Sequence, residues 1–563
     1  MKQTYMEKYE NWRARVTEAD LQGDLNSMDD VTISDRFSNM LEFGTGGMRG
    51  VLGAGLDRMN IYTVGRACKG FADYLTKIGA DKSKGVAIAH DNRRMSKEFA
   101  LHSAGVLAAA GVKTYLFTDL RPTPELSFAV RHLGCVGGIV ITASHNPPEY
   151  NGYKLYDENG CQMVSPYADY VIEMVEAVAD ELDVACLSRE QAGDLIETIG
   201  AEVDNAYYKA VEGIQLDKTS DKSGLKVVFS PQHGAACVPV TEILRGLGYN
   251  LIRVEEQCTA DPEFSHTKNP NPEDPASFEL AIKLAKEVSA DICITTDPDG
   301  DRVGVAAYHK GEWVYFTGNQ TGALLIDYVL SRRAALNKIG DKGVMINTVV
   351  TSEIGDAIAR KYDVAVVKTL TGFKFIGDKI HEYELSGQYD FQFGYEESYG
   401  YMIESFVRDK DSVQAAVMVC EMANALKLEG KTLVDALEAI YKEHDYHIES
   451  QLAITLKGKE GQEKIAQIMK SYRSNPPKEI AGIAVKAYED YLTSKRVEDG
   501  VEEALTLPVS DVLKYVLEDG SWAAIRPSGT EPKCKFYFGV KAKEKSDAEA
   551  LHAKIRAVFD VKY

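Results

Sequence analysis

The sequence has few basic residues for its acidic content, and it has no long apolar segment. Its 563 residues include 64 Lys and Arg against 85 Asp and Glu, which gives a formal net charge of −21. This balance argues against nucleic acid or an anionic membrane as a partner, because both attract basic surfaces. No run reaches the roughly 18 apolar residues of a membrane span, and Met1 to Arg15 lacks the apolar core of a signal peptide. We therefore expect a cytoplasmic protein.

Two common cysteine and serine motifs are also absent. The nine cysteines lie scattered from Cys68 to Cys534 and include no C-x-x-C pair, which suits reduced thiols rather than disulfides or zinc. The nucleophile elbow of serine hydrolases has Gly two residues on either side of its serine, whereas Thr142 and Asn146 occupy those positions around Ser144. A serine-hydrolase interpretation is therefore weak.

The chain is long enough for several domains, since about 150 residues per domain suggests three to five. Short apolar strands alternate with helical patterns in three successive rounds, which predicts three tandem doubly wound α/β domains. Strands beyond the Ser474–Pro477 break predict a smaller C-terminal α+β domain. The predicted bounds are 1–40 for an N-terminal helical extension, 41–212, 213–322 and 323–445 for the α/β domains, and 446–563 for the last domain.

The apolar run Val136–Ile141 predicts a buried strand that ends shortly before Ser144. In an open α/β sheet, ligands bind at this carboxyl edge. His145 adjoins the serine and Lys154 follows within a short span, so a nucleophile, a polar neighbour and a cation lie close together. These neighbouring residues favour a reactive serine over a serine that only caps a turn.

Three aspartates follow another predicted strand, as Asp297-Pro298-Asp299-Gly300-Asp301. Carboxylates at i, i+2 and i+4 can converge on one hard cation, and Mg²⁺ is preferred because so few ligands leave room for phosphate oxygens and water. An EF-hand would have Gly and Glu where Arg302 and Tyr308 stand. The haloacid-dehalogenase phosphotransferases offer a rival interpretation, with Asp297 as nucleophile. They expect Thr or Val in place of Asp301, and they leave Ser144 unexplained.

Two further loops contain groups suited to an anionic ligand. Four glycines surround Arg49 in the loop 41–50, so the backbone can approach a ligand while the guanidinium projects into it. The segment Arg526–Thr530 offers a guanidinium, two hydroxyls and Gly-freed amides as a cradle for a phosphate dianion. A plain polar turn explains the second loop equally well when it is taken alone.

Together these motifs resemble, in order, the four signature loops of the α-D-phosphohexomutase superfamily: Thr142–Pro147, Asp297–Arg302, Gly394–Ser398 and Arg526–Pro532. The resemblance covers about residues 40 to 540. The loop 41–47 and the segments 371–374 and 408–411 look most like the phosphoglucomutase and phosphopentomutase branch. Tyr395 stands where many members have Phe.

The resemblance implies a role for each candidate residue. Ser144 would be the phosphorylated serine, and its phosphate would hold Mg²⁺ together with Asp297, Asp299 and Asp301. His145, Lys154 and Arg49 would assist proton transfer or steady the phosphoryl group. On physical grounds, Arg302 and Lys154 would neutralise the charge that develops during the transfer. The sugar and its second phosphate would be bound by Thr371, Gly372, Lys374, Glu396, Ser398, Arg526, Ser528, Gly529 and Thr530. The family architecture would place four domains around a central cleft.

The resemblance therefore predicts a Mg²⁺-dependent phosphoglucomutase that interconverts α-D-glucose 1-phosphate and glucose 6-phosphate. The reaction would pass through a phosphoserine enzyme and glucose 1,6-bisphosphate, which would also serve as activator. Phosphomannomutase and phosphopentomutase are alternatives within the class, and a non-catalytic phosphosugar-binding protein is an alternative outside it. We expect a monomer or a small homo-oligomer.

Overall fold

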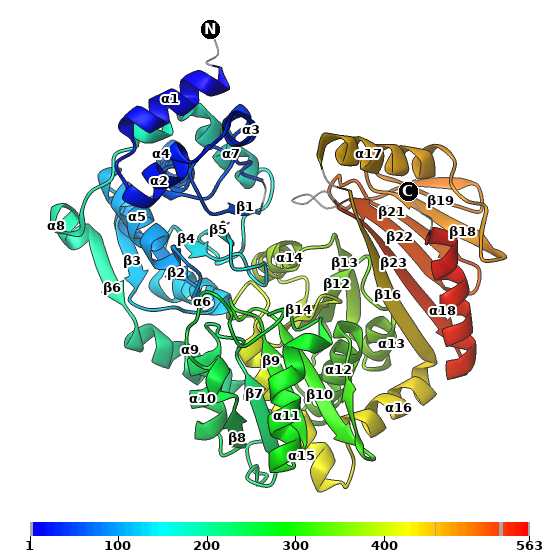
Figure 1. Cartoon of the computed structure of the whole chain (residues 1–563). Coiled ribbons are helices and arrows are strands. Elements are labelled where there is room, and N and C mark those ends of the chain that lie inside the picture. The colour runs from blue at the N-terminus through cyan, green and yellow to red at the C-terminus, as the bar shows by residue number, and fades with distance from the viewer. Residues whose placement is uncertain (1–3, 45, 457, 528–532, 561–563) are drawn as a thin grey trace. The chain divides into compact units, whose positions relative to one another are not determined.

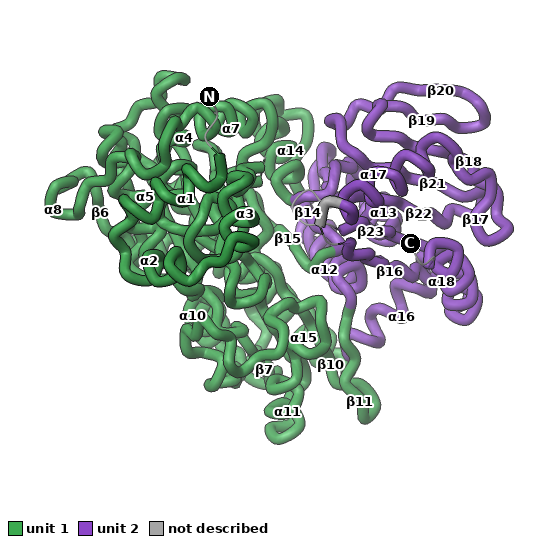
Figure 2. The backbone as a smooth tube through the Cα atoms, turned by 45° about the horizontal axis from the view of Figure 1, so that its top comes forward, with its two compact units in different colours: residues 1–316, 373–391, 398–430 green, residues 317–372, 392–397, 431–563 purple. Residues whose placement is uncertain are grey.

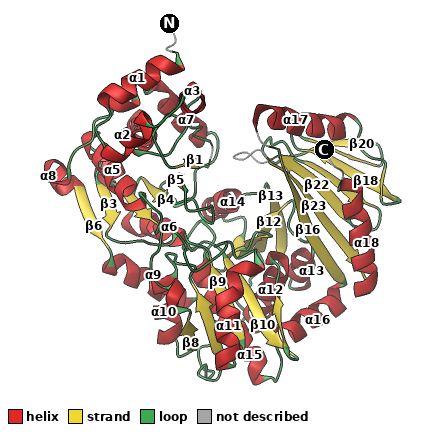
Figure 3. Cartoon of the chain, in the orientation of Figure 1, coloured by secondary structure: helices red, strands yellow, loops and turns green. Residues whose placement is uncertain are grey.

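The computed structural model describes residues 4–44, 46–456, 458–527 and 533–560, without the side chains of 458 and 459 (Figure 1). These residues form two compact units, each built from three stretches of the chain (Figure 2). Unit 1 contains Met1–Phe316, Phe373–Phe391 and Ser398–Gly430, and unit 2 contains Thr317–Gly372, Gln392–Glu397 and Lys431–Tyr563. Each unit contains both helices and strands (Figure 3).

The N-terminal segment is helical, as the sequence predicts. A capping box formed by Thr4 and Glu7 begins its first helix. The buried rings of Trp12 and Phe37 meet edge to face, with centroids 5.7 Å apart, so the helices share a small core of their own. The three helices are α1 (Tyr5–Arg15), α2 (Ala19–Asn26) and α3 (Asp30–Ser38).

The first sheet of unit 1 has the strand order β1-β5-β4-β2-β3-β6. Its central strands are parallel, while β5 is antiparallel to β4 and β1 is antiparallel to β5. The edge strand β6 lies within a mainly helical stretch of the chain, between α8 (Arg189–Ala192) and α9 (Ala201–Gly213). The strands are β1 (Met48–Val51), β2 (Val86–His90), β3 (Thr114–Phe117), β4 (Gly137–Ile141), β5 (Tyr150–Tyr156) and β6 (Ile196–Ile199).

Helices cover this sheet and share its core. Phe71 and Phe99 from two of them lie in one buried cluster with Ile88 and Ile139 of the parallel strands. Because these strands are buried on both faces, their sequences are continuous apolar runs rather than alternating ones. The helices of this part of the chain are α4 (Ile61–Lys77), α5 (Ser96–Ala109), α6 (Thr123–Leu133), α7 (Tyr167–Ala177), α8 (Arg189–Ala192) and α9 (Ala201–Gly213), of which α9 packs on other helices.

The second sheet of unit 1 has the order β11-β10-β9-β7-β8. Strands β7, β8 and β9 are parallel, and β10 and β11 continue the sheet as an antiparallel hairpin. The strands are β7 (Lys226–Ser230), β8 (Asn250–Arg253), β9 (Ile292–Thr296), β10 (Val303–His309) and β11 (Glu312–Tyr315). The other elements of this unit are α10 (Cys237–Gly246), α11 (Glu279–Val288), α14 (Phe373–Ser386), β15 (Gly400–Met402) and α15 (Ser412–Leu428).

Unit 2 begins with a third sheet in which β12 lies between β13 and β14, with β12 and β13 parallel. Tyr395 of β14 packs closely against glycines of two helices: a Cβ added to Gly322 would come within 2.5 Å of its ring, and one added to Gly355 within 2.4 Å of its hydroxyl. The elements are β12 (Gly343–Thr348), β13 (Ala365–Thr369), β14 (Asp390–Glu396), α12 (Gly318–Ala335), α13 (Ile354–Lys361) and α16 (Leu433–His444).

The C-terminal part of unit 2 is an antiparallel sheet with the order β16-β23-β22-β21-β18-β19-β20. Helices α17 (Gly458–Ser474) and α18 (Lys545–Phe559) pack on it, and Phe536, Phe538 and Phe559 lie in their shared core (Figure 3). The strands are β16 (Tyr446–Thr455), β17 (Glu479–Ile480), β18 (Ile483–Asp490), β19 (Lys495–Glu498), β20 (Val501–Ala504), β21 (Leu513–Leu517), β22 (Trp522–Pro527) and β23 (Lys533–Ala542).

Three sheets that contain parallel strands, followed by an antiparallel sheet with helices, confirm the predicted α/β class with a C-terminal α+β part. The domain bounds given above stay predictions. The bound between 322 and 323 falls inside α12, and unit 2 begins at Thr317, just before that helix. Among the described residues, none of the helices combines the length and apolar character required to span a membrane.

Candidate active site

Ser144 lies three residues after β4, at the carboxyl edge of the first sheet. Its side chain is buried, and its backbone has a left-handed φ of 52°, which is costly for a residue other than glycine. Its amide donates to Thr142 Oγ1 over 2.8 Å. Its hydroxyl lies 3.1 Å from Asp297 Oδ2 and 3.2 Å from His145 Nδ1. The serine is therefore in direct contact with the first aspartate of the triad.

Arg93 fixes the backbone of the serine loop. Its guanidinium donates to the carbonyl of Ser144 over 2.6 Å and to the carbonyls of Asn146, Pro147 and Tyr150. This side chain is fully buried, and burial lowers the pKa of the guanidinium while the nearby Asp91 carboxylate raises it. One arginine thus stabilises the strained conformation of the loop.

Asp297, Asp299 and Asp301 lie in the turn between β9 and β10, and one oxygen of each lies within 4.8 Å of the others. All three are buried. Asp299 Oδ1 and Asp301 Oδ1 have no hydrogen-bond partner among the described residues. Buried carboxylate oxygens without partners are costly, and a hard cation prefers oxygen ligands of this kind. The donor set therefore fits Mg²⁺.

Cationic side chains surround the triad. Lys154 Nζ lies 2.9 Å from Asp299 Oδ2 and 3.5 Å from Asp301 Oδ2, and Lys410 Nζ lies 2.7 Å from Asp301 Oδ2. Arg302 lies 3.9 Å from Asp297 and 3.7 Å from Asp301, and its guanidinium also pairs with Glu273 at 3.0 Å. These cations offset the three carboxylate charges and create a site suited to additional negative charge.

Asp297 and Asp299 contrast in their protonation. Burial raises the pKa of Asp297 well above its usual value, and the charges of Asp301 and Asp299 raise it further. Burial also opposes ionisation of Asp299, but the charge of Lys154 and a hydrogen bond from it outweigh this and lower the pKa of Asp299. Asp297, which contacts the serine hydroxyl, is therefore the carboxylate that most lacks a compensating cation.

His145 and Arg49 complete the surroundings of the serine. Burial lowers the pKa of His145 well below its usual value, with the charges of Arg302 and Arg49 acting in the same direction. The imidazole is therefore neutral at pH 7. Arg49, on β1, donates to Asn146 Oδ1 over 2.8 Å. Gly47 precedes it at a φ of 107°, where a Cβ would lie 1.9 Å from the Tyr153 carbonyl oxygen, so only glycine permits this approach of β1 to β5.

The predicted sugar-binding residues fall into both units. In unit 2, the amide of Gly372 donates to Glu396 Oε1 over 2.7 Å, and the Thr371 hydroxyl is buried without a hydrogen-bond partner among the described residues. Lys374 and Ser398 belong to unit 1, where the Lys374 ammonium lies 5.2 Å from the Phe375 ring centroid. The structure thus places Glu396 beside the 371–372 turn.

The predicted phosphate loop follows β22. Arg526 belongs to that strand, and its backbone lies opposite that of Lys535 in the antiparallel pair of β22 and β23. Ser528, Gly529 and Thr530 lie outside the described residues. Their predicted role stays a prediction.

Arg93, Lys410, Thr123 and Glu273 have contacts in this site that the sequence did not reveal. The Thr123 amide donates to the Asp299 carbonyl over 2.8 Å, so helix α6 begins against the triad. The available signal for Arg93 was its position just after a strand, where ligands and their supports gather. Lys410 was visible only as part of a resembling motif, because its contact with Asp301 joins residues more than a hundred positions apart.

Comparisons with known proteins agree with this arrangement. Four family models of phosphoglucomutase/phosphomannomutase match the chain: α/β/α domains I, II and III over residues 40–181, 205–310 and 317–444, and the C-terminal domain over 425–558. A putative phosphomannomutase from Thermus thermophilus has a similar fold, with a TM-score of 0.68 and 24% identity over 93% of this chain and 100% of its own. Parafusin from Paramecium, described as a phosphoglucomutase in its open form, gives a TM-score of 0.67 and 17% identity over 93% and 94%.

These matches define the chain as a member of an α/β class of sugar-phosphate mutases. A phosphoglucomutase of Staphylococcus aureus is 39% identical over 551 residues, covering 97% of this chain and 98% of the relative. The chain belongs to the phosphoglucomutase/phosphomannomutase family, within the α-D-phosphohexomutase superfamily. The predicted family and the prediction of an isomerase of this kind are confirmed.

Proposed function

We propose that this protein is a Mg²⁺-dependent phosphoglucomutase that interconverts α-D-glucose 1-phosphate and glucose 6-phosphate. The observation that carries the proposal is the contact between the Ser144 hydroxyl and Asp297. The other two aspartates of the triad each have one buried carboxylate oxygen without a hydrogen-bond partner among the described residues. A reactive hydroxyl and a site for a hard cation are thereby adjacent. The 39% identity to a phosphoglucomutase over nearly the full chain supports the choice of sugar.

In the proposed cycle, phosphorylated Ser144 donates its phosphoryl group to the free hydroxyl of the sugar phosphate. The bond from Ser144 Oγ to phosphorus breaks as the bond from the sugar oxygen forms, and the sugar hydroxyl proton leaves to a base. The bisphosphate then presents its other phosphate to the same Ser144 Oγ. The bond from that phosphorus to its sugar oxygen breaks as the bond to Ser144 Oγ forms, the sugar oxygen takes up a proton, and the isomeric monophosphate departs. Both ends of one sugar must therefore visit one serine.

Phosphoryl transfer has a loose, charge-rich transition state, so the site must align the reacting oxygens and neutralise charge. Asp297, Asp299 and Asp301 would hold Mg²⁺ together with the serine phosphate. When bound, Mg²⁺ polarises the phosphoryl oxygens and offsets their charge. Lys154 and Arg302, which lie beside the triad, would stabilise the equatorial oxygens. His145 Nδ1 lies within hydrogen-bonding distance of the unphosphorylated serine hydroxyl.

The remaining roles are proposed on the same basis. Glu396 and Ser398 would bind sugar hydroxyls, and Thr371, Gly372 and Lys374 would bind the sugar phosphate. Arg526 with Ser528, Gly529 and Thr530 would hold the phosphate that is not being transferred, and Arg49 would steady the phosphoryl group. Glucose 1,6-bisphosphate would act as intermediate and activator. A cytoplasmic location and a monomer or small homo-oligomer stay predictions.

A coupled assay over the 1-phosphates of glucose, mannose, N-acetylglucosamine and ribose tests this function, with Mg²⁺ and trace bisphosphate present. We expect the highest kcat/KM for glucose 1-phosphate and no turnover after Mg²⁺ is chelated. A clear preference for mannose or ribose phosphate would shift the assignment to phosphomannomutase or phosphopentomutase. Absence of turnover on all four sugars, with binding retained, would favour a non-catalytic binding protein.

A further inference from the structure

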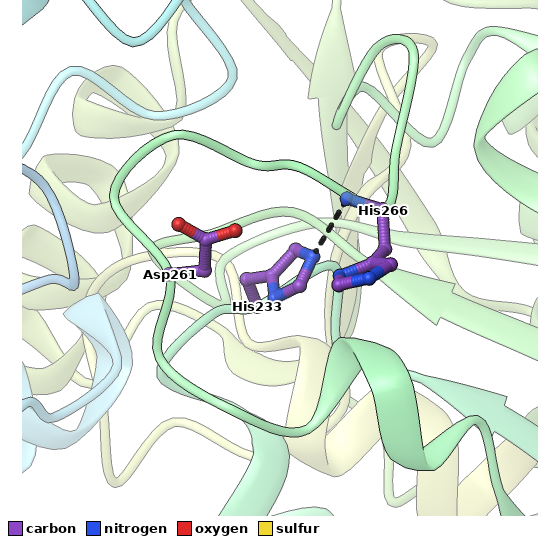
Figure 4. A group of neighbouring side chains, drawn as sticks. All are labelled: His233, Asp261 and His266. Carbon is purple, nitrogen blue, oxygen red and sulfur yellow. Dashed lines mark hydrogen bonds between the residues drawn. The ribbon is translucent and has the colours of Figure 1, made fainter.

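A second group of metal-ligating side chains lies in unit 1, apart from the aspartate triad (Figure 4). His233 belongs to the loop after β7, whereas Asp261 and His266 belong to the long loop after β8. One ligand atom from each residue lies within 4.8 Å of the others. The proposed mutase reaction makes no use of these three side chains.

The hydrogen bonds of His233 fix which ring nitrogen can bind a metal. Its Nδ1 lies 2.8 Å from the carbonyl oxygen of Thr259, and because a carbonyl only accepts, Nδ1 must donate. The lone pair is therefore on Nε2, which faces the backbone amide of His266 at 3.3 Å (Figure 4). That contact is longer than the usual 2.9–3.0 Å. A ring nitrogen that donates to a backbone carbonyl is typical of metal-ligating histidines, and an ion bound at Nε2 would replace the hydrogen bond from the His266 amide.

The other two ligands are arranged to close around the same point. The Asp261 carboxylate is held by the amides of Glu263 and Ser265, each at 2.9 Å. The exposed imidazole of His266 has its centroid 5.5 Å from that of His233. A tetrahedral ion with bonds of 2.0–2.1 Å separates its ligands by roughly 3.4 Å. The three ligand atoms lie within 4.8 Å of one another, so binding an ion would require them to come closer together. His266 is the exposed residue of the three, and we expect its side chain to make this movement.

We propose that His233, Asp261 and His266 form a second metal site, specific for a borderline transition-metal ion of the Zn²⁺ type, with its fourth position open to solvent. Two imidazoles and one carboxylate are the ligand set of such ions, whereas Mg²⁺ takes carboxylate, carbonyl and water oxygens. The two groups of metal ligands would therefore select different ions. The oxygen-only triad suits the hard cation, and the nitrogen-rich group suits the softer one.

The loop around Asp261 also contacts Arg93, the arginine that donates hydrogen bonds to the serine loop. The Arg93 guanidinium lies 5.1 Å from the Phe264 ring centroid, and Asn92 donates to the Asp261 carbonyl over 2.9 Å. On the other side of the site, Ala235 donates to the Pro298 carbonyl in the triad turn over 2.8 Å. An ion that joins His233 to the Asp261 loop would therefore brace two segments that contact the catalytic loops, and it would stabilise unit 1.

Isothermal titration with Zn²⁺ alone tests the site. The Asp299→Asn variant is used as the starting protein, because the substitution weakens Zn²⁺ binding at the aspartate triad. Tight Zn²⁺ binding that remains in this variant is then assigned to His233, Asp261 and His266. We expect His266→Ala, added to Asp299→Asn, to weaken that binding by at least about tenfold, since even second-shell losses cost 10–100-fold. The matched control is His132→Ala, which removes another exposed histidine of unit 1 and should leave binding unchanged.

The Co²⁺-loaded full chain gives a second readout that does not depend on activity. Nitrogen ligands in a four-coordinate site produce strong visible absorption, which should be present in the parent and in His132→Ala and absent in His266→Ala. In the Asp299→Asn background, Zn²⁺ should also raise the unfolding temperature, and this rise should be lost when His266→Ala is added. Because His266 is exposed and alanine keeps its backbone amide, the variant should fold. Equal Zn²⁺ affinity or equal Co²⁺ absorption in the two proteins would overturn the proposal.

Discussion

Ser144 combines a strained backbone with contacts on both sides of its side chain. The left-handed φ persists because Arg93 binds the carbonyls of the loop and Thr142 accepts the serine amide. The hydroxyl then lies where Asp297 and His145 both reach it. A residue that is held in a strained backbone conformation by several surrounding contacts is typical of active sites.

Replacement of Ser144 by alanine should remove nearly all mutase activity and leave folding intact. The hydroxyl contributes to the reaction and only weakly to the core, so the free energy of unfolding should change by no more than about 1–2 kcal/mol. Intact-mass measurement should find one added phosphate on the parent after incubation with glucose 1,6-bisphosphate, and none on the variant. A phosphate on Asp297 in either protein would instead support the dehalogenase type of chemistry.

Arg93→Lys should lower both activity and stability. Lysine keeps the positive charge but loses the planar fork that reaches several carbonyls at once. Carbonyls left without partners in a buried loop cost roughly 1–3 kcal/mol, and the relaxed serine should lower kcat more than it changes KM. Urea unfolding and steady-state kinetics measure the two effects.

Arg94→Lys is the matched control for that variant, since Arg94 is the neighbouring, half-exposed arginine and pairs with Glu263. An exposed pair of this kind contributes little. If the two variants behaved alike, the loop-fixing role of Arg93 would be refuted.

At the scale of elements, helix α15 begins at a buried aspartate. Asp411 accepts hydrogen bonds from the amides of Val413 and Gln414 and from the Tyr207 hydroxyl. Burial raises the pKa of Asp411 to about 6, although these hydrogen bonds act in the opposite direction. Helix α15 follows the segment that supplies Lys410 to the triad, so its N-terminus positions that cation.

This pKa makes stability depend on pH with a defined sign. Between about pH 4 and pH 6 the unfolded chain has released the proton of Asp411 while the folded protein retains it, so stability falls as the pH rises. Asp411→Asn removes the ionisation and should flatten this part of the profile. The difference in unfolding free energy between variant and parent should rise by roughly 3 kcal/mol from pH 4 to pH 7.

Asp29→Asn provides a control of opposite sign. Asp29 caps α3 in the same way, but it is exposed, and the hydrogen bonds from Thr32 lower its pKa. Its contribution is therefore present above about pH 4 and lost as the pH falls. Urea titrations of both variants at several pH values give the comparison. Parallel pH profiles for Asp411→Asn and the parent would contradict the buried ionisation.

At the scale of the whole molecule, the two compact units have separate buried cores. One core gathers Phe71, Ile88 and Tyr153 in unit 1, and another gathers Tyr515, Phe536 and Phe538 in unit 2. The proposed Mg²⁺ ligands all belong to unit 1. A chain with this organisation is expected to depart from two-state unfolding.

Scanning calorimetry should therefore show more than one transition, and Mg²⁺ should raise only the transition of unit 1. At a hundred times its dissociation constant, the ion adds about 2.7 kcal/mol to the stability of the unit that binds it. Asp299→Asn should remove this shift and leave the other transition unchanged. A single transition whose calorimetric and van't Hoff enthalpies agree would refute the independence of the two cores.

The sequence by itself determined the fold class and the local motifs. Apolar runs such as Val136–Ile141 fix strands, and the spacing of Asp297, Asp299 and Asp301 fixes a local carboxylate cluster, because neighbours in the chain are neighbours in space. The edge strand β6 escaped this reasoning. It is short and only partly buried, so its pattern carries little signal.

Only the tertiary structure decided which distant residues meet. The contact of Ser144 with Asp297 joins residues 153 positions apart, and that of Lys410 with Asp301 joins two separate α/β segments. The grouping of His233 with Asp261 and His266 depends on how two loops pack after their strands. Such contacts follow from packing and from the order of strands in a sheet, which local periodicity does not contain.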